Sequence, residues 1–205
     1  MAYHLKIERR PGKVHPGKND LVDTDCKVVK KCSKDKSVCS QVCERGSVVV
    51  PDWLQSTLAY RRNLALKKPF CLAQIPATHN SAITLADGFE NRDQLFYQNV
   101  DPRKTWSCLK TNNQVLSLTD QLILSVRFLE IDTHFFLNDL RTGHCGSLNS
   151  TVLTELSDAL VSGIKSSEQP LTKDGLKEAK VWIDANPNEF VVVYLDTGAD
   201  IERLN

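Results

Sequence analysis

The stretch from Val126 to Asp132 constrains the fold of this chain more than any other part of the sequence. Its apolar residues are β-prone and no helix stop signal interrupts them, so we predict a buried strand. Two carboxylates, Glu130 and Asp132, stand two residues apart at its C-terminal end, and side chains at this spacing point to the same face of a strand. Two like charges on one buried face are unfavourable unless a cation or a proton is held between them. The alternative is that both are solvated residues at a frayed strand end.

A histidine returns toward this strand. Asn138 and Asp139 favour a turn, after which the chain runs through Thr142 and Gly143 to His144. We therefore predict that the turn brings His144 beside the carboxylate pair. A solvated histidine is the alternative.

Two other apolar runs predict strands that also end in polar residues. Phe70–Ile75 is followed by His79 and Asn80, and Phe190–Leu195 is followed by Asp196. Near-continuous apolar strands separated by helices indicate a parallel sheet. In parallel α/β folds the catalytic and binding residues lie at the C-terminal ends of the strands. The agreement of three strand ends therefore predicts a functional site there.

The side chains at these strand ends form a specific donor set. One amide and three carboxylates supply only oxygen, which suits a hard cation such as Ca²⁺ better than zinc or copper. The predicted metal ligands are Asn80, Glu130, Asp132 and Asp196. Two histidines from different strands, His79 and His144, suit a general base and a general acid working near pH 7.

Helical periodicity predicts four helices, at residues 51–68, 117–125, 151–161 and 173–185. The first carries the basic pairs Arg61-Arg62 and Lys67-Lys68, which suit contact with anionic lipid headgroups. Packing of this helix on the main domain, with its basic ends in solvent, is the alternative interpretation. No apolar run approaches the roughly 20 residues that a membrane-spanning helix needs.

The first 50 residues differ from the rest of the chain. Residues 1–25 are polar and interrupted by proline and glycine, which predicts a flexible leader. Residues 26–50 have too few apolar side chains to fold without cross-links, but they contain four cysteines, Cys26, Cys32, Cys39 and Cys43. No histidine accompanies these cysteines, so disulfides are favoured over a zinc site. We therefore expect a secreted protein whose signal peptide precedes this sequence; a cytosolic protein with reduced thiols is the alternative.

Charge is distributed unevenly, although the net charge of the 205-residue chain is only +1. Residues 1–68 carry 15 Lys or Arg and 7 Asp or Glu, whereas residues 69–205 carry 11 and 18. The part that contains the predicted site is therefore acidic, which argues against a nucleic-acid partner.

Four segments together form a recognisable pattern. They are Ile75-Pro76-Ala77-Thr78-His79-Asn80-Ser81, Gln121-Leu122 with the following Arg127 to Asp132, Gly143-His144, and Val193-Tyr194-Leu195-Asp196. This pattern resembles the X region of phosphatidylinositol-specific phospholipase C, and most closely the plant-type PLC-like phosphodiesterases of that superfamily. The similarity runs from about Phe70 to the C-terminus, two thirds of the chain.

The resemblance implies a TIM barrel. A complete (β/α)₈ barrel takes about 250 residues, whereas 136 residues run from Phe70 to Asn205. We therefore expect residues 51–205 to form the N-terminal part of a barrel with a leading helix, preceded by the Cys-rich extension. Strand edges left open in such a half-barrel predict low stability of the isolated chain.

The resemblance also implies a reaction, the cleavage of a phosphodiester in a phosphoinositide-type lipid. In the family the inositol 2-hydroxyl attacks phosphorus and expels diacylglycerol. His79 and His144 match the family's catalytic histidines. His79, or alternatively Glu130, would assist removal of the hydroxyl proton, and His144 would protonate the leaving alkoxide. A phospholipid substrate also implies peripheral contact with a membrane surface.

The same resemblance implies the cofactor. Asn80, Glu130 and Asp132 match the calcium ligands of the family's eukaryotic branch, whereas the bacterial branch dispenses with the metal. Asp196 stands where the calcium-dependent enzymes typically have a glutamate, and Ser125 stands where the family often has glycine.

Two other functions are open at this point. Glycerophosphodiester phosphodiesterases share the barrel, a Glu-x-Asp pair and two histidines, but they begin with a His-Arg-Gly motif. Here His79 is followed by Asn80-Ser81, which favours the phospholipase side. The other possibility is a non-catalytic barrel fragment that binds lipid headgroups.

Overall fold

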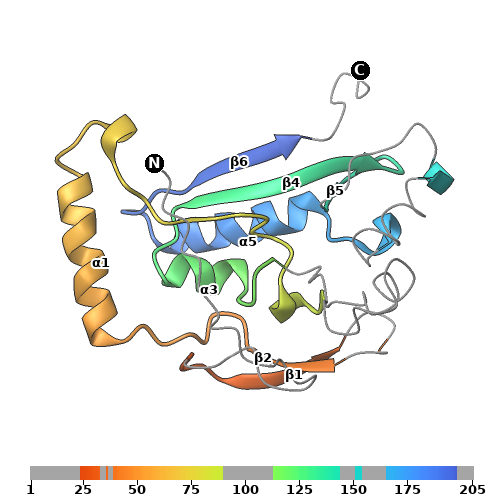
Figure 1. Ribbon diagram of the computed structural model, residues 1–205, viewed down its shortest axis with the longest axis horizontal. Coiled ribbons are helices and arrows are strands. Elements are labelled where there is room, and N and C mark those ends of the chain that lie inside the picture. The colour runs from red at the N-terminus through yellow and green to blue at the C-terminus, as the bar shows by residue number, and fades with distance from the viewer. Residues whose placement is uncertain are drawn as a thin grey trace, which may run out of the picture.

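The computed structural model describes residues 24–32, 36, 39–89, 113–143, 151–153 and 165–197. Nearly all of the predicted leader (1–25), His144 and most of the predicted helix 151–161 lie outside these residues. The described elements form one mixed sheet with helices packed on it, and a two-stranded hairpin beside it (Figure 1).

Three parallel strands form the centre of the sheet. β4 (Phe128–Phe136) lies between β3 (Ala77–Thr78) and β6 (Val192–Thr197) and runs parallel to both. The predicted parallel sheet is confirmed, as is the third predicted strand, although it begins at Val192 instead of Phe190. The described residues do not close the sheet into a barrel, so the half-barrel stays a prediction.

Two helices cover one face of this sheet. α3 (Leu118–Ile123) and α5 (Thr172–Ala185) confirm two predicted helices and pack against each other and β4. The buried core that they share with β4 consists of Ala82, Leu118, Leu122, Val126, Leu129, Ile131 and Ala179. Because successive side chains of a strand alternate between faces, Glu130 and Asp132 lie on the face of β4 away from Leu129 and Ile131.

β4 is longer than predicted. It continues past Asp132, because β5 (Asp139–Thr142) returns antiparallel beside this extension. The connecting residues Leu137 and Asn138 have φ values of 49° and 64°, as a two-residue type I′ hairpin turn requires. The predicted turn is thus confirmed, one residue earlier than Asn138 and Asp139. The predicted strand end at Asp132 is wrong, and both carboxylates lie within the strand.

The strand predicted at Phe70–Ile75 is wrong. This segment begins with a 3₁₀ turn, η1 (Phe70–Leu72), whose two large apolar side chains are exposed. The strand beside β4 starts only after Pro76, since proline has no N–H to donate to a strand ladder. The carbonyl of Pro76 instead accepts hydrogen bonds from the backbone N–H groups of Arg127 and Phe128.

The Cys-rich segment forms a hairpin of β1 (Val28–Cys32) and β2 (Cys39–Cys43). Disulfides Cys26–Cys43 and Cys32–Cys39 confirm the predicted cross-linking, which is typical of an oxidising environment. The main domain covers the apolar side of the hairpin. The side chains in this contact are Cys26, Cys43, Val48, Val115, Leu116 and Leu124.

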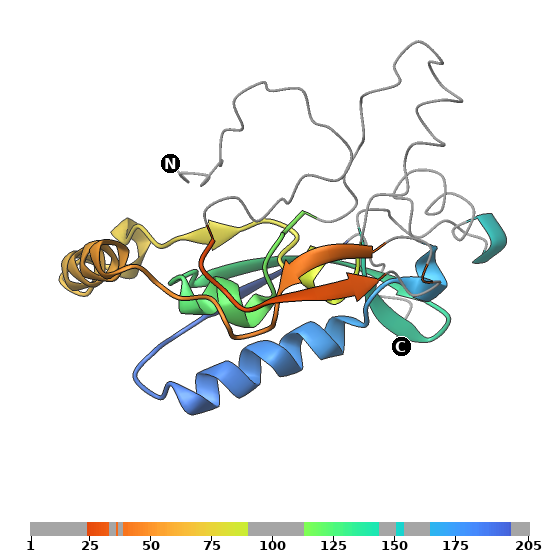
Figure 2. The ribbon, with the colours of Figure 1, turned by 90° about the horizontal axis from the view of Figure 1, so that it is seen from below.

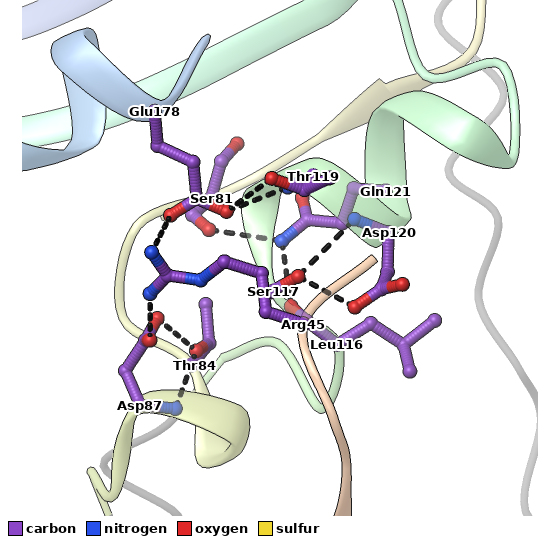
Figure 3. Close-up of polar contacts among 10 residues, drawn as sticks. All are labelled: Arg45, Ser81, Thr84, Asp87, Leu116, Ser117, Thr119, Asp120, Gln121 and Glu178. Carbon is purple, nitrogen blue, oxygen red and sulfur yellow. Dashed lines mark hydrogen bonds and ion pairs between the residues drawn. The ribbon is translucent and has the colours of Figure 1, made fainter. Parts of the chain in front are cut away.

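Arg45 fixes the hairpin to the domain (Figure 3). Its guanidinium lies 2.5 Å from Asp87 Oδ1 at the end of η2 (Leu85–Asp87) and 3.3 Å from Glu178 Oε2 in α5. Nearby, the backbone N–H of Val48 donates to Asp120 Oδ1 in α3 at 3.1 Å. The hairpin is therefore an integral part of the described fold.

Replacing Cys26 and Cys43 together with serine is expected to lower the free energy of unfolding by roughly 3 kcal/mol, because the cross-link restricts the unfolded chain. Urea unfolding of the purified chain measures this change. Cys71 is an exposed free cysteine, so Cys71→Ser is the matched control and should leave the unfolding midpoint unchanged. A double variant as stable as this control would contradict a stabilising role for the disulfide.

The first predicted helix also forms, as α1 (Asp52–Ala65), beyond the end of the sheet at which β4 and β6 begin (Figures 1 and 2). None of its side chains is buried. One link to the domain is the ion pair of Arg62 with Glu189, and Glu189 also accepts a hydrogen bond from Arg127 Nε at 3.0 Å. No helix in the described part of the chain is long and apolar enough to cross a membrane.

Candidate functional site

Three carboxylates gather on the face of the sheet opposite α3 and α5. Glu130 and Asp132 are two residues apart on β4, and Asp196 of β6 is the register partner of Asp132. One oxygen of each carboxylate lies within 4.8 Å of the other two. Glu130 is buried, Asp132 is half-buried and Asp196 is exposed, so the cluster opens from the sheet toward solvent.

Glu130 is the most constrained of the three. Its Oε2 accepts a hydrogen bond from the backbone N–H of Asn80 at 2.8 Å and lies 3.5 Å from His79 Nε2. Burial raises the pKa of Glu130, and the nearby Asp132 raises it further, whereas the Asn80 N–H and His79 act in the opposite direction. Burial and the neighbouring Asp132 thus make the ionised form of Glu130 costly, and either a proton or a bound cation would offset that cost.

The predicted residues His79 and Asn80 follow directly on β3. Asn80 has φ of 50°, a left-handed conformation that asparagine tolerates better than most residues. The next residue, Ser81, donates its backbone N–H to the carbonyl of Glu130 at 2.8 Å. The loop is thus bonded to β4 on both sides of the Asn80 side chain, and the predicted ligands from β3 and β4 are brought together.

Gln121 of α3 supports this loop through hydrogen bonds (Figure 3). Its Nε2 donates to the carbonyls of Ser81 at 3.0 Å and Leu116 at 2.9 Å, and its Oε1 accepts from Thr78 Oγ1 at 2.8 Å. Gln121 belongs to the sequence pattern that resembles the phospholipase family, but no role was predicted for it. The sequence carries no signal for such a support, which becomes evident only from the structure, where Gln121 is 3% exposed.

Two further residues, which were not predicted to belong to the site, surround His79. Asn113 Nδ2 lies 3.2 Å from His79 Nδ1, and Gln114 Nε2 donates to the His79 carbonyl at 2.7 Å. The amide nitrogen of Asn80 lies 3.1 Å from the same Nδ1. The imidazole itself remains 61% exposed, so a substrate can reach it.

His144 lies outside the described residues, but the structure describes the chain up to Gly143. The N–H of Gly143 donates to the carbonyl of Asp132 at 3.3 Å, and that of Thr142 donates to the carbonyl of Pro170 at 2.8 Å. The residue before His144 is therefore bonded to the strand that carries the carboxylates. The predicted return of the chain toward this strand is confirmed as far as Gly143.

β4 carries one more ionisable residue that the sequence reasoning passed over. His134 is the next residue after Asp132 on the same face of the strand, and it is fully buried. The alternating pattern Glu-x-Asp-x-His was the available signal. Its burial separates it from the exposed part of the carboxylate cluster.

Comparisons with known proteins give no match: no family model matches the chain, and no curated protein or solved structure matches it significantly. The chemistry of the site itself is thus the basis for a functional assignment. Its oxygen-only carboxylate cluster fits a hard cation, and the exposed histidine beside it fits proton transfer or hydrogen bonding to an anionic substrate.

Proposed function

We propose that this protein is a phosphoric diester hydrolase of the phospholipase C type, acting on a phosphoinositide-type or related phospholipid. The observation that carries this proposal is the grouping of Glu130, Asp132 and Asp196 within 4.8 Å of one another, with His79 Nε2 3.5 Å from Glu130. A carboxylate cluster next to a histidine provides both a cation site and a proton-transfer group, which together suit attack on a phosphodiester.

The architecture supports membership of the PLC-like phosphodiesterase superfamily and its barrel. β3, β4 and β6 lie side by side in sequence order, and α3 and α5 pack on one face of β4. A TIM barrel begins in this way, whereas a doubly wound sheet reverses its strand order and places helices on both faces. The functional residues then lie on the face that points into a barrel.

The donor set supports Ca²⁺ as the cofactor. Glu130, Asp132 and Asp196 would hold the ion together with the amide oxygen of Asn80, whose backbone is bonded to Glu130. These are hard oxygen ligands, and the pKa of Glu130 is raised first by burial and then by Asp132, a cost of its ionised form that a cation would offset. When bound, Ca²⁺ would lower the pKa of the attacking hydroxyl and offset charge that develops on the phosphoryl oxygens.

Different residues of the chain then carry out the two proton transfers, one from the attacking hydroxyl and one to the leaving group. His79 and Glu130 form the group that receives the proton of the attacking hydroxyl, because their side chains face each other at the rim of the site. His144 follows the anchored Gly143 and serves as the acid that protonates the leaving alkoxide. Such a residue contributes about 10²–10⁴ in rate.

Secretion and contact with a membrane surface belong to the same proposal. The two disulfides suit an oxidising compartment. Exposed Trp53 and Tyr60 on α1, with Arg61 and the following Lys67, combine aromatic and basic side chains as surface-binding helices do. α1 lies at the opposite end of the strands from Asp132 and Asp196, so this contact would attach the protein rather than deliver lipid to the site.

An activity assay on two substrates tests the function. The chain should release diacylglycerol from phosphatidylinositol vesicles, lose this activity in excess chelator and regain it when Ca²⁺ is added. Hydrolysis of glycerophosphoinositol instead would indicate a glycerophosphodiester phosphodiesterase. Vesicle binding without cleavage of either substrate would indicate a headgroup-binding protein, and full activity in excess chelator would contradict the calcium site.

A further inference from the structure

The imidazole of His79 has partners of opposite character at its two nitrogens. Nδ1 faces two amide nitrogens, Asn80 Nδ2 at 3.1 Å and Asn113 Nδ2 at 3.2 Å. Nε2 faces a carboxylate oxygen, Glu130 Oε2, at 3.5 Å. An amide nitrogen can only donate a hydrogen bond, and an ionised carboxylate can only accept one.

These partners are compatible with one tautomer of the neutral ring. With the proton on Nε2, Nδ1 accepts from the amides and Nε2–H points to Glu130. With the proton on Nδ1, an N–H would face two amide NH₂ groups and a lone pair would face the carboxylate of Glu130, and both contacts are repulsive. The tautomer of a histidine is set in general by the hydrogen bond that its other nitrogen makes.

Asn113 is held firmly in this position. Its backbone N–H and that of Gln114 donate to the carbonyl of Ile83 at 3.1 and 3.2 Å. The side chain of Gln114 donates to the His79 carbonyl at 2.7 Å, and Leu85 donates its N–H to the Gln114 carbonyl at 2.8 Å. The same short segment therefore anchors the backbone of His79 and presents an amide to its ring.

We infer that Asn113 is a positioning residue that fixes His79 in the tautomer with its proton on Nε2. The tautomer is assigned from the geometry alone, whereas its role in catalysis rests on the proposed function. In this tautomer His79 offers an N–H to Glu130 or to a phosphoryl oxygen, and no ring lone pair is left for the attacking hydroxyl. Glu130 then becomes the proton acceptor of the His79–Glu130 pair.

Nitrogen NMR of the full chain labelled at histidine distinguishes the tautomers directly. Spectra are taken near pH 9, where an ordinary histidine, with a pKa of about 6.5, is neutral. Among the five histidines, the signals of His79 are those lost in His79→Gln. We expect the protonated nitrogen to be Nε2 in the unaltered chain.

Two variants with the shape of asparagine test the role of Asn113. Asn113→Asp offers only an acceptor and should move the proton to Nδ1, whereas Asn113→Leu should leave a mixture of tautomers. Either variant should lower kcat roughly 5- to 10-fold, the size expected for one hydrogen bond, with little change in KM. Asn188→Asp at an exposed position before β6 makes the same chemical change and should alter neither the His79 spectrum nor turnover.

The spectra test the tautomer and the kinetics test its role in catalysis, so each part of the inference can be refuted independently. A proton on Nδ1 in the unaltered chain, or a tautomer that does not respond to Asn113→Asp while the backbone spectrum stays folded, would overturn the inference. A tautomer that responds as expected in a chain that cleaves no phosphodiester would refute the proposed function and leave the positioning of His79 by Asn113 supported.

Discussion

Replacing His79 with alanine is expected to lower phosphodiester turnover by at least about 10², the lower range for the loss of one hydrogen-bond donor to charge that develops in the transition state. The imidazole is 61% exposed and contributes little packing, so the free energy of unfolding should change by less than about 0.5 kcal/mol. Initial rates on phosphatidylinositol vesicles and urea unfolding of the same preparations measure the two effects. Loss of activity together with loss of folding would show that His79 is structural.

The companion variant His144→Ala should cost a similar factor if His144 protonates the leaving group. Residues that act as a unit have non-additive effects, so the double variant should lose little more than either single one. Turnover unchanged by His144→Ala would remove its assignment as the acid. Losses that multiply would show that the two histidines act in independent steps.

The parallel sheet was predictable because its signal is local. β4 and β6 are apolar runs with strand propensity, and the spacing of Glu130 and Asp132 determines that they share a face. The predicted burial holds for β4 but not for β6, whose Val193, Tyr194 and Leu195 are exposed among the described residues. The register partner of Asp132 was not predictable in this way. Pairing with Asp196 follows from the alignment of two strands more than sixty residues apart, which depends on how α5, between them in the sequence, packs on the sheet.

The prediction of a strand at Phe70–Ile75 was wrong for a physical reason that the apolar composition of this segment does not reveal. An apolar run predicts a strand only if a neighbouring strand can pair with it, and Pro76 interrupts the ladder just where pairing with β4 would begin. The extension of β4 beyond Asp132 was missed for the converse reason. Thr133 to Phe136 become strand because β5 folds back on them.

The supporting residues of the site were the least predictable. Gln121, Asn113 and Gln114 act through hydrogen bonds to the loop after β3, with partners about 30 to 40 residues away in the chain. A single amide side chain has no periodicity or spacing in the sequence from which such a contact could be predicted. The ionisable residues of the proposed site were easier to predict, because burying a charged group beside an apolar run is unfavourable unless a partner or a function offsets the cost.

Replacing Asp132 with asparagine is expected to raise the Ca²⁺ concentration needed for half-maximal activity by at least about tenfold, since one ionised ligand of three is lost. The change also relieves repulsion with Glu130, so the metal-free variant should be at least as stable as the unaltered chain. Asp184→Asn is the matched control, because Asp184 is an exposed carboxylate on α5 that pairs with Lys180. Calcium titrations of activity and of thermal unfolding give both quantities.

The pH dependence provides a second test of the same site. Because the pKa of Glu130 is raised in the folded state, the folded chain binds a proton at this carboxyl more tightly than the unfolded chain does. Without metal, the contribution of protonated Glu130 to stability is therefore greatest at low pH, and it is lost as the pH rises through the raised pKa. Ca²⁺ must displace that proton, so the stabilisation by Ca²⁺ should run the other way, small at low pH and growing through the same range. Asp132→Asn should weaken both trends, since it removes a charge that raises the pKa of Glu130. Calcium stabilisation that is independent of pH, or equal in Asp132→Asn and Asp184→Asn, would mean that the ion binds elsewhere and that the carboxylates hold protons instead.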